Sequence, residues 1–337
     1  MFFKGSGIGI DLGTTSVLVY NDKKGIVLQE PSVVAMNEFT GSVLAIGEEA
    51  HKMRGKAPRN IKIIRPLRQG VISDYDVTEI MLKHFIKKAI GKRLIKPRIA
   101  VCVPSGITEI EKRAVENATR QSGARRVKII TEPLAAAIGA QLDVRQPYGN
   151  MVVDIGGGTS DIAVISLSGE VINSSLRIAG DNFDDAIIVY IRKTYNLAIG
   201  EVTAENIKIE IGGALDRNQP TTMEIKGVNI VDGLPKRIEI TSTEITQSIS
   251  EIVDSIIQTI YNVLELTPPE LIADILEKGM ILTGGGSLLY GLDKLIYERL
   301  GIAANIATEP VKCVAIGTGL FAMHAFDKEP KIKKGKI

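Results

Sequence analysis

Two stretches of the chain combine residue types that together can hold a polyphosphate. In "IGIDLGTTSVLVY", residues 8–20, Asp11 ends an apolar run and is followed by glycine, two threonines and a serine. "MVVDIGGGTSDIAVI", residues 151–165, repeats this order around Asp154. Glycine lets the backbone approach a ligand closely, and backbone N–H and hydroxyl groups can donate to phosphate oxygens. One such segment alone is more typical of an ordinary hairpin turn, whereas the matched pair predicts a clamp on a polyphosphate.

The two aspartates predict a cation rather than a direct phosphate contact. A carboxylate repels phosphate, but it can hold a hydrated divalent cation that bridges phosphate oxygens. A third glycine cluster, "LTGGGSLL" at residues 282–289, suits the approach of a nucleotide's sugar or base, although three glycines alone are a weak signal. The chain has no Gly-x-x-x-x-Gly-Lys-Ser/Thr, and its first strand–helix turn has no Gly-x-Gly-x-x-Gly. These absences argue against a P-loop NTPase and a Rossmann dehydrogenase.

Strands and helices alternate around these segments. β-branched residues on both sides of each aspartate loop predict strand hairpins. Residues 76–91 have apolar side chains at helical spacing, with Asp76 and Glu79 as the expected cap and Gly91 as the stop. The second half of the chain repeats the alternation. The sequence therefore predicts two α/β units in tandem that face one cleft.

Composition limits the classes of function. The chain has 337 residues, enough for about two domains, with 45% hydrophobic and 24% charged residues, as in a globular protein. A net charge of +2 does not favour a nucleic-acid binder, and the scattered His51, His84 and His324 do not favour a histidine metal site. Cys102 and Cys313 are expected to be buried thiols in a reducing compartment. Without a signal-peptide pattern or a membrane-spanning apolar run, we expect a cytoplasmic protein.

Four motifs in order, "DLGTTS", "TEPLAAAIGA", "VVDIGGGTSD" and "ILTGGGSLLYGL", resemble the ATPase shared by actin, heat-shock chaperones and sugar kinases. Further stretches, among them "IRPLRQGVISDYDVTEIMLKHFI", "TPPELIADILEKGMILTGGG" and "CVAIGTG", resemble the MreB/Mbl family of bacterial actin homologues. The resemblance covers roughly residues 5–325. It implies an α/β chain with an actin-like fold, in which two duplicated ribonuclease-H-like domains flank a nucleotide cleft.

The resemblance also implies how the chain is divided. Domain I would span residues 1–144, with an accessory subdomain at about 33–70. A C-terminal helix at about 312–326 would pack back on domain I. Domain II would span residues 145–337, with an accessory subdomain at about 182–243.

Site roles follow from the same resemblance. Asp11 and Asp154 would organise magnesium through water, and Glu132 and Thr159 would form the catalytic pair that orients the attacking water. The alternatives are that Glu132 is only a strand-end carboxylate before a proline and that Glu205 and Lys208 form a solvent-facing ion pair. The residues expected to bind ATP or ADP are Gly13, Thr14, Thr15, Ser16, Gly157, Gly158, Thr159, Ser160, Glu205, Asn206, Ile207, Lys208, Gly285, Gly286, Ser287 and Leu288.

Two departures from the family pattern stand out. The first loop reads Thr-Thr-Ser where the family usually shows Thr-Ala-Asn, a change that keeps small polar groups and leaves nucleotide binding expected. Thr131 stands where a second glutamate often precedes Glu132. We expect this second change to alter the hydrolysis rate.

The implied function is an ATPase that forms membrane-associated filaments and organises cell-wall synthesis to maintain a rod shape. Its partners would be other copies of the chain in head-to-tail protofilaments, paired antiparallel, the inner face of the cytoplasmic membrane, and membrane proteins of cell-wall synthesis and elongation. No nucleic-acid partner is expected. A filament that positions plasmids or organelles is one alternative, and a sugar-kinase-like phosphotransferase is another. A chaperone ATPase is disfavoured because only "DKEPKIKKGKI" follows the last expected helix.

Two short segments predict direct membrane attachment. "MFFK" places Phe2 and Phe3 at the N-terminus, and "GKRLIKPR" places Leu94 and Ile95 within a basic loop. Isolated exposed apolar side chains are common, so an ordinary surface is the alternative. The resemblance favours membrane insertion, because the second segment falls where the family carries an apolar loop. The basic residues Lys92, Arg93, Lys96 and Arg98 would meet anionic headgroups.

Overall fold

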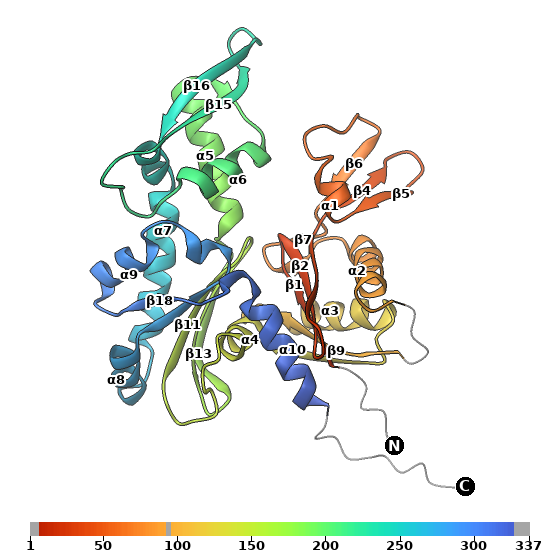
Figure 1. The fold of residues 1–337 in the computed structure, drawn as a ribbon, viewed down its shortest axis with the longest axis vertical. Coiled ribbons are helices and arrows are strands. Elements are labelled where there is room, and N and C mark those ends of the chain that lie inside the picture. The colour runs from red at the N-terminus through yellow and green to blue at the C-terminus, as the bar shows by residue number, and fades with distance from the viewer. Residues whose placement is uncertain (1–6, 92–95, 327–337) are drawn as a thin grey trace.

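The computed structural model describes residues 7–91 and 96–326, and two five-stranded mixed sheets form its centre (Figure 1). The first sheet has the order β10 (Arg126–Thr131), β9 (Arg98–Val103), β1 (Gly7–Leu12), β2 (Ser16–Asn21) and β3 (Gly25–Pro31). The second has the order β18 (Ala304–Ile306), β17 (Met280–Thr283), β11 (Asn150–Ile155), β12 (Ser160–Ser166) and β13 (Gly169–Leu176).

The two sheets have the same topology. In each, an antiparallel three-stranded meander is extended by two strands parallel to its first strand. The central strands are rich in valine and isoleucine and are buried on both faces, as expected for strands covered by helices. Asp11 and Asp154 occupy corresponding positions near the ends of β1 and β11. The shared topology supports the duplication expected from the repeated aspartate loops.

Helices cover the two sheets and link them. The longer helices of the first half are α2 (Tyr75–Ile90), α3 (Glu109–Gln121) and α4 (Glu132–Gly139). Those of the second half are α5 (Gly180–Tyr195), α6 (Glu201–Ile211), α7 (Ser242–Glu265), α8 (Pro269–Lys278), α9 (Leu292–Leu300) and α10 (Cys313–Ala325), with 3-10 turns at η1 (Gly285–Leu288) and η2 (Pro310–Lys312). Along α7, every fourth or third residue is an isoleucine or valine, and these side chains join the core of the second half.

Helix α10 returns from the second half to pack on the first, between α4 and strands β1 and β9 (Figure 1). Glycines allow this close approach. A Cβ atom at Gly139 would lie 1.9 Å from the carbonyl oxygen of Cys313, and one at Gly317 would lie 1.8 Å from that of Ala135. A Cβ at Gly9 would come within 2.3 Å of the backbone of Gly319. The helix therefore packs backbone against backbone beneath the cleft.

The start of α2 differs from the expectation. Asp74, not Asp76 or Glu79, is the N-cap, and its side chain accepts a hydrogen bond from the N–H of Val77. The predicted cap was wrong because the N-cap lies two residues before Asp76, which places Asp76 in the first turn of the helix. Gly91 ends the helix as predicted, with a φ of 67° that favours glycine.

Each half carries a small sheet at its outer end, and Figure 1 shows the two facing each other across a gap. In the first half it consists of β4 (Val34–Asn37), β5 (Val43–Ile46) and β6 (Ile61–Ile64) with α1 (Glu48–His51), followed by the hairpin of β7 (Leu67–Arg68) and β8 (Val71–Ile72). In the second half it consists of β14 (Leu197–Ala198), β15 (Thr222–Asn229) and β16 (Pro235–Thr241), next to α5 and α6. We call the two large units the first and second domains, and these outer parts the accessory lobes.

Both cysteines, Cys102 and Cys313, are buried free thiols, as expected. Among the helices of residues 7–91 and 96–326, none combines the length and hydropathy needed to cross a bilayer.

Candidate nucleotide site

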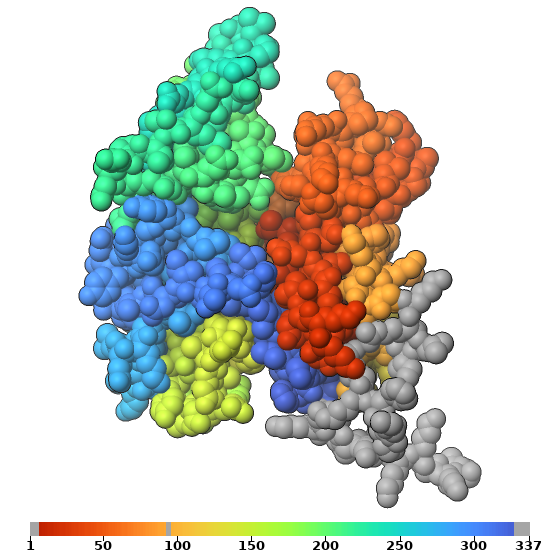
Figure 2. All heavy atoms as spheres, in the orientation of Figure 1, coloured from red at the N-terminus to blue at the C-terminus, as the bar shows by residue number. Residues whose placement is uncertain are grey.

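A cleft of about 650 Å³ lies between the two domains, and its mouth opens between the accessory lobes (Figure 2). Its walls combine both aspartate loops, the start of α4, the first turn of α5, one face of α6 and the third glycine cluster. The structure thereby brings together segments that are far apart in the sequence. Of the predicted site residues, those lining the cleft are Asp11, Gly13, Thr14, Thr15, Ser16, Glu132, Asp154, Gly157, Gly158, Thr159, Glu205, Lys208, Gly285, Gly286 and Leu288.

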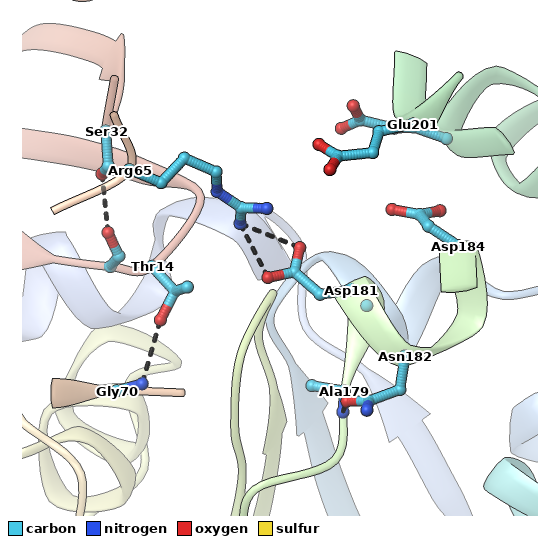
Figure 3. A network of polar contacts seen from close by, with 12 residues as sticks. Thr14, Ser32, Arg65, Gly70, Ala179, Asp181, Asn182, Asp184 and Glu201 are labelled. Carbon is cyan, nitrogen blue, oxygen red and sulfur yellow. Dashed lines mark hydrogen bonds and ion pairs between the residues drawn. The ribbon is translucent and has the colours of Figure 1, made fainter. Parts of the chain in front are cut away.

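The two aspartate loops meet across the cleft floor. A Cβ atom at Gly157 would lie 1.6 Å from the Thr15 hydroxyl oxygen, and one at Gly158 would lie 2.6 Å from that of Thr14. The first loop is also held by its own domain, because the N–H of Gly70 donates to the Thr14 hydroxyl at 3.0 Å (Figure 3). Only glycine at 157 and 158 lets the loops approach this closely, so their N–H and hydroxyl donors surround one small space.

Three carboxyl groups converge near this space. Burial raises the pKa of Asp11 to about 6, although a hydrogen bond from the Cys102 thiol at 3.3 Å lowers the pKa in part. Burial likewise raises the pKa of Asp154 to about 7, although the Thr283 hydroxyl donates to it at 2.6 Å. Glu132, the first residue of α4, has a pKa well above its usual 4.5, first because of burial and then because of neighbouring aspartates. Burial without a counter-charge thus disfavours the ionised form of all three carboxyl groups, and a bound cation would stabilise it.

The donor chemistry fits magnesium. Carboxylate oxygens are the hard ligands that this ion prefers, and it commonly keeps several waters and takes its other ligands from phosphates. Among the described residues, no group of three or more His, Cys, Asp or Glu side chains is arranged to hold a metal by itself. Asp11 and Asp154 would therefore need water and phosphate oxygens to complete the coordination of a magnesium ion.

Asp161 is a buried carboxyl group that was not predicted. Asp161 on β12 pairs with Asp154 of β11 in the ladder and is fully buried, and burial raises its pKa to about 6. Its Oδ1 accepts a hydrogen bond from the N–H of Ser105 at 2.9 Å, so it joins the two domains beneath the cleft. The second aspartate of "DIGGGTSD" was visible in the sequence, but the alternation of the strand gave no indication that it faces the other domain.

The opposite end of the cleft is built from α6 and the third glycine cluster. Glu205 and Lys208, three residues apart on α6, share the face that lines the cleft. Lys208 is already engaged, because its Nζ lies 2.9 Å from an oxygen of Asp184 and donates to the Gly180 carbonyl at 3.0 Å. A Cβ at Gly286 would lie 2.2 Å from the Ile155 side chain, so this glycine lets the cluster pack on the end of β11.

Four of the predicted nucleotide-binding residues do not line the cleft. The Ser160 hydroxyl donates to the Ile178 carbonyl, and the Ser287 hydroxyl donates to that of Gly284, so both are committed within the protein. Ile207 is fully buried in the core, and Asn206 is exposed outside the cleft. For the two residues on α6, the reason is the helical repeat: positions 206 and 207 point away from the helix face that 205 and 208 share.

Two arginines of the first accessory lobe cross the mouth of the cleft. The NH2 group of Arg65 donates to both carboxylate oxygens of Asp181, in the first turn of α5, at 2.7 and 2.9 Å (Figure 3). Arg54 lies 2.5 Å from Glu201 and 3.8 Å from Glu205 on α6. These cross-cleft pairs, Arg65–Asp181 and Arg54–Glu201, were not predicted, because charged residues in accessory segments carry no local signal of a partner more than a hundred residues away.

Arg217 and Tyr290 are also missed cleft residues. The Arg217 guanidinium lies 4.4 Å from the centre of the Tyr290 ring, a cation–π contact, and its NH2 group donates to the Gly212 carbonyl. Both residues line the cleft beside the third glycine cluster. The flat surface that they form suits stacking with a planar base.

The predicted membrane residues Phe2, Phe3, Leu94 and Ile95 lie outside the described residues. The described chain on either side of them is informative, because Gly7 at the start of β1 pairs with Arg98 at the start of the parallel strand β9. Both segments therefore enter the fold at the same end of the first sheet.

Comparison with known proteins decides the family. A model of the family described as MreB/Mbl protein matches residues 5–329. The chain belongs to the MreB/Mbl family. It is 51% identical over 327 residues to the cell shape-determining protein Mbl of Bacillus subtilis, covering 97% of this chain and 98% of that protein. It is 47% identical over 330 residues to the cell shape-determining protein MreB of Escherichia coli K12, covering 95% of each.

Solved structures place this MreB/Mbl chain in the actin-like fold. The crystal structure of MreB5 of Spiroplasma citri bound to AMPPNP has a TM-score of 0.89 and 38% sequence identity, over 94% of this chain and 96% of that one. The same protein bound to ADP has a TM-score of 0.90. The MamK double helical filament, at 22% identity and a TM-score of 0.81, supports the fold alone. The predicted fold class is therefore confirmed.

Proposed function

We propose that this MreB/Mbl chain binds ATP with magnesium in the interdomain cleft and hydrolyses it. The observation that carries the proposal is the meeting of the two glycine loops over Asp11, Asp154 and Glu132. Donors from both loops would hold the phosphates, while α6 and the third glycine cluster would hold the adenosine. Magnesium, when bound, would neutralise charge on the phosphate oxygens. The structures of MreB5 of Spiroplasma citri with AMPPNP and with ADP support nucleotide binding by this chain.

Hydrolysis needs a water molecule placed in line with the terminal phosphate. Its oxygen would bond to the γ-phosphorus as the bond to the β–γ bridging oxygen breaks and ADP leaves. One proton of the water would stay on the released phosphate, and the other would pass to a phosphate oxygen or to solvent. Phosphoryl transfer depends more on positioning and charge neutralisation than on a strong base. Glu132 from the first domain and Thr159 from the second both line the cleft, so together they would orient that water.

We further propose that the chain polymerises head to tail into filaments and that the filaments maintain cell shape. Relatives at 47–51% identity over nearly the whole chain are named cell shape-determining proteins, which favours this role over plasmid or organelle positioning. An open head-to-tail contact on an actin-like fold propagates without closing. Antiparallel pairing of protofilaments and partnership with membrane proteins of cell-wall synthesis are part of the proposal.

Attachment to the inner face of the cell membrane would use Phe2, Phe3, Leu94 and Ile95. Their entry into the fold at one end of the first sheet supports a common anchoring site. Peripheral attachment of this kind requires no spanning helix.

The deciding experiment follows phosphate release and polymer together. Purified protein is incubated with magnesium and ATP, ADP or AMPPNP, and the released phosphate and the pelletable fraction are measured. We expect phosphate release with ATP and polymer with ATP and AMPPNP. Phosphate transfer to a sugar in a panel assay would favour the kinase alternative. Protein that stays monomeric with every nucleotide, in solution and on lipid, would remove the filament proposal.

A further inference from the structure

Thr131, the residue before Glu132, stands at the N-cap of α4 but does not cap the helix with its side chain. Thr131 is the N-cap of α4, where a hydroxyl oxygen usually accepts a hydrogen bond from the helix's own first turn. In the described structure its side chain makes no such bond. The Thr131 hydroxyl instead donates to the Glu170 carboxylate on β13, in the second domain. A group that normally stabilises its own helix is thus used to join two domains.

A second contact lies beside the first. The Ser105 hydroxyl lies 3.2 and 3.4 Å from the two oxygens of Glu170, and the N–H of Ser105 donates to buried Asp161 at 2.9 Å. Ser105 follows β9 and Thr131 ends β10, so both belong to the first domain. Asp161 and Glu170 belong to β12 and β13 of the second. We call Ser105, Thr131, Asp161 and Glu170 the interdomain clasp.

The clasp matters because the proposed catalytic pair is itself divided between the domains. Glu132 is attached to the first domain and Thr159 to the second, so the water between them is oriented only if the domains keep their relative position. Thr131 is bonded covalently to Glu132, and its hydroxyl donates a hydrogen bond to the second domain at the start of α4, where the helix also packs on β11 and β12. A small displacement of a positioning group is costly in such a reaction.

We propose that Thr131 and Glu170 are positioning residues for Glu132. They hold the start of α4 against the second domain, so that the Glu132 carboxylate faces the Thr159 loop. A glutamate at position 131 would bring two carboxylates into contact, whereas the threonine supplies a hydroxyl donor to the Glu170 carboxylate. The inference rests on the proposed hydrolysis.

Single substitutions test the positioning role. We expect Thr131→Val and Glu170→Gln each to slow phosphate release at saturating ATP by about five- to tenfold, with ATP affinity unchanged within about twofold. Thr131→Ser keeps the hydroxyl and should restore the rate. Thr241→Val is the matched control, because Thr241 caps α7 through its own side chain, far from Glu132. Unchanged phosphate release in Thr131→Val and Glu170→Gln, or equal loss in Thr131→Ser, would overturn the proposal.

A reciprocal exchange tests whether the two residues act through each other. Thr131→Glu alone should be the slowest variant because of carboxylate repulsion, and adding Glu170→Thr should recover most of the rate. A double-mutant cycle on urea unfolding, with Thr131→Val and Glu170→Gln, measures the same contact without nucleotide. If the wild type is active and the effects of the substitutions at 131 and 170 simply add in both phosphate release and urea unfolding, the clasp is rejected. The proposed ATP hydrolysis is then unaffected. A wild type that releases no phosphate would reject the proposed function, and the positioning role with it.

Discussion

At the scale of single residues, Glu132 is the group on which turnover should depend most. Its carboxyl group is buried at the start of α4 among three aspartates. Its proposed role is to orient the attacking water and not to bind the nucleotide. We expect Glu132→Gln to slow phosphate release at least tenfold, about 1.4 kcal/mol of barrier, with ATP affinity within a few-fold of the wild type. Single-turnover phosphate release and nucleotide titration measure the two quantities. A variant with normal turnover would remove Glu132 from the mechanism.

Asp154 should make the stability of the nucleotide-free protein depend on pH. Burial raises its pKa from 3.8 to about 7, so the folded chain holds this proton more tightly than the unfolded chain. The resulting stabilisation is complete below the ordinary pKa and is lost as pH rises through about 7. We expect the free energy of unfolding in EDTA to fall between about pH 5 and pH 8 more steeply in the wild type than in Asp154→Asn. Urea titrations across this range measure it, and parallel profiles for the two proteins would contradict it.

At the scale of elements, the cross-cleft pairs connect the first accessory lobe to α5 and α6. Arg65 and Asp181 are partly buried, and one guanidinium nitrogen of Arg65 donates to both carboxylate oxygens, so this contact should contribute more than an exposed ion pair. Closing the lobes over a bound nucleotide would slow its escape. We expect Arg65→Ala to speed the release of a fluorescent ATP analogue about three- to tenfold, equivalent to about 1 kcal/mol.

The matched control is Arg299→Ala, which removes an exposed pair with Asp254 on helices away from the cleft. Its release rate should equal that of the wild type. If Arg65→Ala and Arg299→Ala release the analogue at the same rate, the Arg65–Asp181 contact does not retain nucleotide.

At the scale of the whole molecule, membrane attachment should depend on polymerisation. Each inserted apolar side chain would contribute roughly 1.5–3 kcal/mol and each nearby basic residue about 1 kcal/mol, which gives reversible binding of one subunit. A filament repeats the anchor, so avidity should make polymer bind much more tightly. We expect the variant with serine at Phe2, Phe3, Leu94 and Ile95 to lose most of its sedimentation with anionic liposomes at matched polymer content.

Tyr297→Ser serves as its control, because it removes an exposed ring on α9 that is not part of the anchor. Liposome binding by the four-residue variant equal to that of this control would leave the anchor without support.

The sequence alone predicted the parts of the site that are local. An aspartate at a strand end, a glycine turn and hydroxyl residues lie within a few positions of one another, so their chemistry is visible without knowing the fold. The same reasoning found the duplication, because equal local patterns form equal hairpins. It also placed Glu205 and Lys208 on one helix face, since helical periodicity is a local property.

Only the tertiary structure decided which side chains meet across the two domains. Arg65 and Asp181 are 116 residues apart, and Thr131 and Glu170 are 39 apart, so no periodicity or spacing links either pair. It also showed that Ser160, Asn206, Ile207 and Ser287 lie off the cleft, where a motif match had included them. A sequence motif marks a segment, but the packing of sheets and helices sets the direction of each side chain. Contacts between domains depend on that packing and carry no local signal.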